Sequence, residues 1–177
     1  MSNKTMNGIE PEFQDTSPGS IVTRWLGVEQ VSDTKREARQ DERSDSTGSS
    51  STGKTITFSA SIESEDRAGD VIRAEGWELD NYRQNPVVLW AHRHDLLPIG
   101  KSVDIWVENG SLYATVEFAQ TEFALQIQQL FEGGFLRGVS VGFRALKTSP
   151  RSSTHHRGTV FERQELLEIS AAPVPMH

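Results

Sequence analysis

The sequence of 177 residues contains no cysteine, which excludes disulfides, thiolate catalysis and thiolate metal ligands. It also lacks an apolar run near the roughly 18 residues that a membrane-spanning helix needs, and its N-terminus lacks the basic-then-apolar pattern of a signal peptide. Cations are the scarcer charge, since 18 Lys and Arg stand against 25 Asp and Glu, for a formal net charge of −7. We therefore expect a cytoplasmic protein that binds neither membranes nor nucleic acid, because phosphate contacts need clustered Lys and Arg.

Two parts of the chain differ in composition. Residues 1 to about 53 are rich in Ser, Thr and charged residues, with little apolar surface to offset the entropy lost on folding, which predicts a disordered polar tail. An apolar patch at 21–28, IVTRWLGV, interrupts the tail as either a transient cluster or a docking segment or added edge strand. Residues 54–177 show the patterns of one folded domain, and the Ser-Thr-Gly run before them is the expected boundary.

The folded part is predicted to be mostly β-structure. Asn109-Gly110 supplies the two positive φ values of a type I′ turn, so residues 104–118 form the clearest hairpin. Thr121 caps an expected helix whose apolar stripe packs on the core and which ends at Gly133-Gly134. Further strands are predicted at 55–63, 86–92, 139–146, 159–163 and 165–174, with a polar loop at 147–158. The result is a mostly antiparallel β domain with at least one packed helix.

Residues 138–142 read Gly-Val-Ser-Val-Gly, the Gly-x-Ser-x-Gly pattern of the α/β-hydrolase nucleophile elbow. The context differs from that motif, because residues 139–146 continue to alternate as a strand and no helix follows Ser140. An acid followed by a histidine is also hard to arrange downstream of Ser140. An esterase or lipase is therefore disfavoured, and a catalytic Ser140 would take its histidine from earlier in the chain.

His92, Ser140 and Glu168 stand out because each lies on or beside a predicted strand and faces away from an apolar neighbour. A Ser-His-acid relay needs these residue types: a hydroxyl attacks, an imidazole takes and returns its proton, and a carboxylate holds the imidazole. The types alone do not decide, since most serines on strands are structural and histidines at strand ends are commonly surface groups. His94 is a competing base two residues after His92.

Four blocks in order form a more specific series. They are DRAGDVI at 66–72, VVLWAHRHDLLPIGK at 87–101, GFLRGVSVGFRA at 134–145 and ELLEISAAPVP at 165–175. In this series the chain resembles the tailed-phage (caudovirus) prohead serine proteases, over about residues 54–177. The resemblance implies a mostly β fold of the α+β class, an antiparallel β-barrel wrapped by helices like that of herpesvirus assemblin.

The resemblance also implies roles for individual residues. The family histidine falls on His92, the nucleophile on Ser140 and the acid on Glu168. Assemblin uses a second histidine as its third member, so His155 or His156 is the alternative partner of His92. Glu168 is preferred, because the two histidines lie in the expected polar loop and a relay needs a rigid partner.

Two groups are candidates for holding the oxyanion or a substrate carboxylate. One is the backbone beside Ser140, at Val141, and the other is the side chain of Arg144, expected on the same face as Ser140. A solvated arginine at a strand end is the alternative interpretation of Arg144. The reaction needs no cofactor, and a metal site at His155-His156 lacks a third ligand at suitable spacing.

The implied function is peptide-bond hydrolysis during virion maturation, inside the assembling procapsid in the bacterial host cytoplasm. Implied substrates and partners are the scaffold protein, scaffold segments joined to the major capsid protein, and the protease itself, as autocleavage target or homo-oligomer. The chain departs from the family where Gly76-Trp77 replaces a Gly-Ala-Phe segment, and where it stops at His177, soon after the acidic motif. An inactive capsid-assembly module of the same fold, or a truncated prophage remnant, is therefore the alternative.

Overall fold

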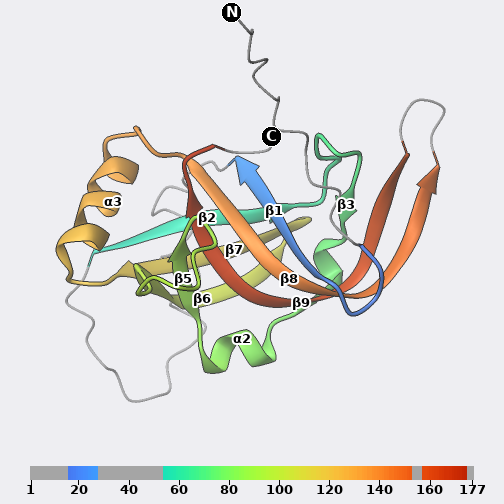
Figure 1. Cartoon of the computed structure of the whole chain (residues 1–177), viewed down its shortest axis with the longest axis horizontal. Coiled ribbons are helices and arrows are strands. Elements are labelled where there is room, and N and C mark those ends of the chain that lie inside the picture. The colour runs from blue at the N-terminus through green and yellow to red at the C-terminus, as the bar shows by residue number, and fades with distance from the viewer. Residues whose placement is uncertain (1–15, 28–53, 153–156, 175–177) are drawn as a thin grey trace, which may run out of the picture.

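The computed structural model describes residues 16–27, 54–152 and 157–174 (Figure 1). Its strands form one curled sheet in the order β1-β8-β9-β5-β6-β7-β2, with β3 and β4 joined to β9. The strands are β1 Ile21–Gly27, β2 Thr55–Ile62, β3 Val71–Ile72, β4 Trp77–Glu78, β5 Val87–Trp90, β6 Gly100–Glu108, β7 Ser111–Phe118, β8 Gly138–Ser152 and β9 Arg157–Ala172. The helices are the 3-10 turn η1 Ala74–Gly76, α2 Asp80–Gln84 and α3 Glu122–Glu132.

The expected fold class, mostly β with packed helices, is confirmed. The two α-helices of the described residues lie at the side and at one edge of the sheet and do not wrap around it (Figure 1). Neither is long and apolar enough to cross a membrane. The core therefore lies mainly within the curl of the sheet, where aromatic side chains such as Phe58, Phe118 and Phe131 pack on one another.

β9 is the strand on which most of the sheet is assembled. β8 pairs antiparallel with one edge of β9, from Gly138↔Ala172 to Ser152↔Arg157. β3, β4 and β5 pair in parallel with the other edge, one after another. Parallel pairing is missing from the sequence prediction because alternation does not show the partner or direction of a strand, and β3 and β4 contain only 2 residues each.

The prediction of a polar loop at 147–158 is wrong for most of that segment. β8 continues to Ser152 and β9 begins at Arg157, so the strands predicted at 159–163 and 165–174 are one continuous strand. Ser and Thr in this region are strand residues of a hairpin with a solvated face, and their polarity resembles that of a loop. Residues 153–156, with His155 and His156, lie outside the described residues.

β1 comes from the segment that was expected to be a tail. It pairs antiparallel with β8, from Ile21↔Arg144 to Gly27↔Gly138, and Val22 is fully buried. The prediction of a disordered tail is therefore wrong for residues 16–27. The apolar patch forms an edge strand because β8 offers it a free edge. The rest of residues 1–53 lies outside the described residues, and the boundary at 54 stays a prediction.

The hairpin and the long helix are as expected. Asn109 and Gly110 have φ values of 49° and 73°, which are those of the type I′ turn. Thr121 accepts a hydrogen bond from the Ala124 N–H at 3.4 Å and caps α3. Local chemistry therefore determines both elements.

Candidate active site

His92, Ser140 and Glu168 come from three segments that the sheet brings together. Ser140 lies in β8 and Glu168 in β9, and the pairs Ser140↔Ser170 and Gly142↔Glu168 set their side chains on one face, since residues two apart share a face. His92 follows the end of β5, which pairs in parallel with β9 just beyond Glu168. The parallel strand β5 therefore delivers the histidine to the β8–β9 pair.

One imidazole bridges the other two side chains. His92 Nε2 lies 2.6 Å from Ser140 Oγ, and His92 Nδ1 lies 2.5 Å from Glu168 Oε1. When Nδ1–H donates to the carboxylate, Nε2 carries the lone pair and accepts the hydrogen bond of the Ser140 hydroxyl. This is the arrangement in which a histidine can take the proton of an attacking serine.

The three side chains are shielded from water. Ser140 is 0% exposed and Glu168 2% exposed, and 11% of the His92 side chain is exposed. Hydrogen bonds to a buried carboxylate are strong in this low-dielectric setting. A buried carboxylate without such bonds would destabilise the fold. Burial of Ser140 also means that a substrate carbonyl reaches its Oγ only if the groups that cover it move.

Ser170 belongs to the same cluster and was missed in the sequence. Its Oγ donates a hydrogen bond to Glu168 Oε2 at 2.6 Å and accepts one from the His92 backbone N–H at 3.1 Å. Its position two residues after Glu168, on the same face of a strand, was the available signal. The contact with the backbone of His92 had no signal in the sequence.

The turn that carries His92 has an unusual backbone. Ala91 and His92 have φ values of 49° and 57°, in the left-handed region that costs a non-glycine residue about 1–2 kcal/mol. β9 holds both residues in place, because the Ala91 N–H donates to the Ala171 carbonyl at 2.9 Å and the His92 N–H donates to Ser170. Such strained residues cluster at functional sites, where surrounding contacts fix them.

The two glycines of the Gly-x-Ser-x-Gly pattern serve packing and not a strand-to-helix turn. A Cβ on Gly142 would lie 2.3 Å from Glu168 Oε1, and a Cβ on Gly138 would lie 2.3 Å from the Ala172 carbonyl oxygen. β8 continues as a strand beyond Ser140, as expected. Gly142 therefore leaves the space in which the Glu168 carboxylate lies.

The two candidate oxyanion groups are engaged elsewhere in this structure. Val141 is paired with β1 on one side and β9 on the other, within the hydrogen-bonded ladder. The Arg144 guanidinium donates to Glu165 at 3.1 Å, and its position on β8 is about 13 Å of extended strand from Ser140. The structure therefore does not bring Arg144 to Ser140. His94, the competing base, is exposed, and the hydrogen bond to Ser140 comes from His92.

Tyr82 is a buried residue of α2 that contacts the strand leading to His92. Burial raises the pKa of its phenol well above the ordinary value, and the Glu168 charge adds to this effect. The neutral hydroxyl lies 2.7 Å from Ser102 Oγ and donates to the Val87 carbonyl at 3.1 Å. Tyr82 therefore fixes the start of β5, the strand that leads to His92.

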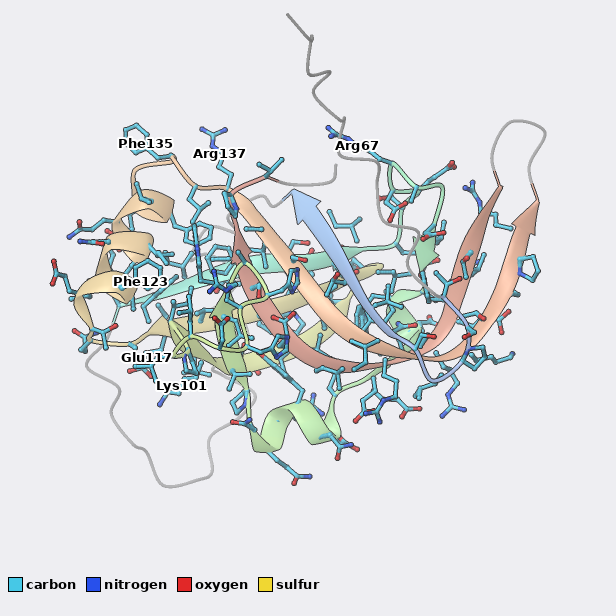
Figure 2. All side chains as sticks on the ribbon, in the orientation of Figure 1. Arg67, Lys101, Glu117, Phe123, Phe135 and Arg137 are labelled. Carbon is cyan, nitrogen blue, oxygen red and sulfur yellow. The ribbon has the colours of Figure 1, made fainter. Side chains whose placement is uncertain are left out.

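Two loops joined to the site carry exposed apolar side chains. Leu97, in the loop after His92, is 81% exposed, and Phe135, in the turn before β8, is 85% exposed. Figure 2 shows Phe135 and Arg137 pointing outward from this turn. Trp90, at the end of β5, packs edge-on against Phe123 of α3 with ring centroids 6.0 Å apart.

A cavity lies away from these residues. It has a volume of about 470 Å³, and its walls come from β4, α2, β6 and β9, with Trp77, Arg83 and Glu165 among them. It is not lined by His92, Ser140, Glu168 or Ser170. In the described part of the chain, no three His, Asp or Glu side chains gather as metal ligands would.

Comparison with known proteins connects this geometry with a family. The chain is similar to the prohead protease of Escherichia phage T5, with 35% identity over 116 residues, which are 63% of this chain and 53% of the relative. The chain therefore spans about half the length of that relative. Its fold is similar to that of the bacteriophage T4 capsid assembly protease, with a TM-score of 0.57 and 11% identity over 88% of this chain and 98% of the other. The family model of the caudovirus prohead serine proteases matches residues 36–177 of the sequence, and the chain belongs to that family.

Proposed function

We propose that this chain is a serine endopeptidase of phage procapsid maturation, with Ser140 as nucleophile, His92 as general base and Glu168 as the third member. The observation that carries the proposal is the single imidazole that contacts Ser140 Oγ through Nε2 and the Glu168 carboxylate through Nδ1. Membership of a serine protease family supports the same assignment.

The reaction follows from these contacts. His92 Nε2 takes the Ser140 proton while Oγ bonds to the scissile carbonyl carbon, and Glu168 stabilises the imidazolium that forms. The imidazolium then gives this proton to the leaving amine as the C–N bond breaks, which leaves an acyl-serine. Water, deprotonated by the same imidazole, releases the acid and restores Ser140. Glu168 stays ionised throughout, because its task is to hold and stabilise the ring.

The proposed substrates are the proteins that surround the enzyme in an assembling procapsid inside the host cytoplasm. They include the scaffold protein, a scaffold segment joined to the major capsid protein, and the chain itself within a homo-oligomer. The names of the T5 and T4 relatives, a prohead protease and a capsid assembly protease, support this setting. Confinement beside the substrate raises the effective concentration, so specificity does not depend on a deep pocket. The exposed side chains of Leu97 and Phe135 are candidate substrate contacts.

The test is to express the full chain with the scaffold and major capsid proteins of the same phage and to map new termini by mass spectrometry. We expect cleavage with the parent chain and with Ser59→Ala, and none with Ser140→Ala. Ser59 is a buried strand serine outside the cluster, so it controls for the substitution. A parent that behaves like Ser140→Ala would indicate a non-catalytic assembly module.

A further inference from the structure

We propose that Ser170 is a positioning residue that holds His92 and Glu168 in their reactive arrangement. The inference rests on the proposed function, because it gives Ser170 a role in that same site. Ser170 bonds to the His92 backbone and to the Glu168 carboxylate, so its effect on Ser140 passes through these two residues.

The direction of each hydrogen bond of Ser170 is determined by chemistry. A backbone N–H only donates, so the Ser170 oxygen accepts from His92 at 3.1 Å. An ionised carboxylate only accepts, so the Ser170 proton goes to Glu168 Oε2 at 2.6 Å. Together with the contact between His92 Nδ1 and Glu168 Oε1, these bonds close a ring in which both carboxylate oxygens have a partner. The carboxylate therefore cannot rotate without breaking one of them.

The same hydroxyl stabilises the strained turn of His92. The left-handed φ values of Ala91 and His92 persist because β9 accepts hydrogen bonds from both backbone N–H groups, through the Ala171 carbonyl and Ser170 Oγ. Ser170 is 0% exposed, so water does not easily replace its oxygen. Loss of this acceptor would leave the His92 N–H without its partner and free the turn to relax. A displacement of the imidazole of about 1 Å costs on the order of 10² in rate.

A second buried strand serine shows that burial alone does not produce such a role. Ser59 in β2 is 6% exposed, yet its Oγ has no hydrogen-bond partner in the described part of the chain. Ser59 and Ser170 are thus the same residue type in similar burial, with and without contacts to the cluster. Substitution of each by alanine separates the loss of a site contact from the loss of a buried hydroxyl.

The experiment compares Ser170→Ala, Ser170→Cys and Ser59→Ala with the parent chain. Turnover of a scaffold-derived peptide gives kcat and KM, and deuterium exchange gives the protection of the His92 backbone amide. We expect Ser170→Ala to lower kcat on the order of 10²-fold with KM nearly unchanged, and to speed exchange at His92. Ser170→Cys, which has a slightly larger side chain of the same shape that donates weakly, should fall between parent and alanine. Ser59→Ala should behave like the parent.

Three outcomes would overturn the inference. They are a parental kcat in Ser170→Ala, an equal loss in Ser59→Ala, and faster exchange that is spread over all of β9, which would indicate general destabilisation. If Ser170→Ala does not fold, Ser170→Cys supports the same comparison because it leaves no cavity. If the parent shows no more turnover than Ser140→Ala, the proposed function fails, and unchanged exchange at His92 would separately refute the role of Ser170.

Discussion

The two ends of the β8–β9 hairpin contain similar residue types but differ in chemistry. At the end near Gly138, polar side chains are buried and bonded to one another, with Ser140, Glu168 and Ser170 all at most 2% exposed. Toward the other end, charged side chains form ion pairs that are exposed to solvent, such as Lys147 with Glu162. The flanking strands also differ, since β1 and β5 flank the near end, whereas the 2-residue strands β3 and β4 pair with β9 toward the other end.

This difference determines what a carboxylate on β9 can do. Glu168 is buried and is part of a ring of hydrogen bonds, so loss of its charge changes the environment of the imidazole directly. Glu162 and its lysine are screened by solvent, and exposed pairs of this kind contribute little. A substitution at the near end is therefore expected to change activity, and one at the far end to change almost nothing.

The largest effect is expected for Glu168→Gln. A neutral amide cannot stabilise the imidazolium and can favour the wrong tautomer, so kcat should fall by up to about 10⁴ while the fold is kept. Peptide turnover with a thermal unfolding curve measures both quantities. Glu165→Gln is the matched control, because Glu165 lies on the same strand but pairs with Arg144 and Asn81, and we expect its activity to stay within a few-fold of the parent.

The same assay distinguishes the two candidate relays. We expect His155→Ala and His156→Ala to remain nearly as active as the parent. A silent Glu168→Gln together with an inactive histidine variant would instead support an assemblin-like relay. That pattern would also mean that the contact between His92 Nδ1 and Glu168 does not contribute to catalysis.

The next effect is expected for Gly142→Ala. Its new methyl group would lie 2.3 Å from Glu168 Oε1, and the carboxylate can move away only by breaking its bonds to His92 and Ser170. We expect kcat to fall on the order of 10²-fold, by misplacement of the ring. In a Glu168→Gln background the same substitution should cost little more, because residues that act as a unit are not additive.

Gly138→Ala is the control variant for Gly142→Ala. Its methyl group would meet the backbone carbonyl of Ala172, which cannot rotate away, so the loss should appear as a lower melting temperature of the whole domain. If Gly142→Ala shows only the same loss of stability at full kcat per folded molecule, the inference that Gly142 makes room for the Glu168 carboxylate is wrong.

The sequence predicts those parts of the fold that local chemistry determines. Asn109-Gly110 specifies its turn and Thr121 specifies the start of α3, and both need only nearby residues. The loop prediction was wrong at 147–152 and 157–158, because Ser, Thr and Pro are common in loops, whereas these residues pair as the ends of β8 and β9. Residue types alone do not show how far the two strands of a hairpin stay paired.

In the candidate site, too, the sequence predicts some residues and not others. The types of His92, Ser140 and Glu168 fit a relay, but the resemblance of whole blocks was needed to choose them from other polar residues. Ser170 was missed because its contact with the His92 backbone joins residues 78 positions apart. Its importance also depends on positive φ values in a turn without glycine, at Ala91 and His92, which residue types do not indicate.

A smaller effect, on stability, is expected at the edge strand that covers the near end. Val22 of β1 is 0% exposed and pairs with Phe143, so Val22→Ala should lower the free energy of unfolding by about 2 kcal/mol. Its neighbour Ile21 is 65% exposed, and Ile21→Ala should be nearly neutral. Urea unfolding of both variants measures the difference. Equal and negligible changes would show that β1 does not belong to the stable domain in solution.

The smallest effect is expected for Lys147→Ala at the far end. Hydrogen bonds from Lys147 and Ser149 lower the pKa of Glu162 below its ordinary value of 4.5. A carboxylate with a lowered pKa stabilises the fold at pH values above its ordinary pKa. This contribution is lost as the pH falls through the folded-state pKa. Lys147→Ala should therefore melt slightly below the parent at pH 7, and the gap should close in acid once Glu162 is protonated in both.

Turnover decides whether the two ends of the hairpin are independent. Lys147→Ala should keep the kcat of the parent, because its ion pair with Glu162 is exposed to solvent and does not touch the buried cluster. Arg67→Ala controls for the change in net charge, since Arg67 is exposed, points away from the sheet and forms no ion pair with a described residue (Figure 2). A kcat that falls several-fold in Lys147→Ala but not in Arg67→Ala would show that strain at the far end reaches Ser140 along β8.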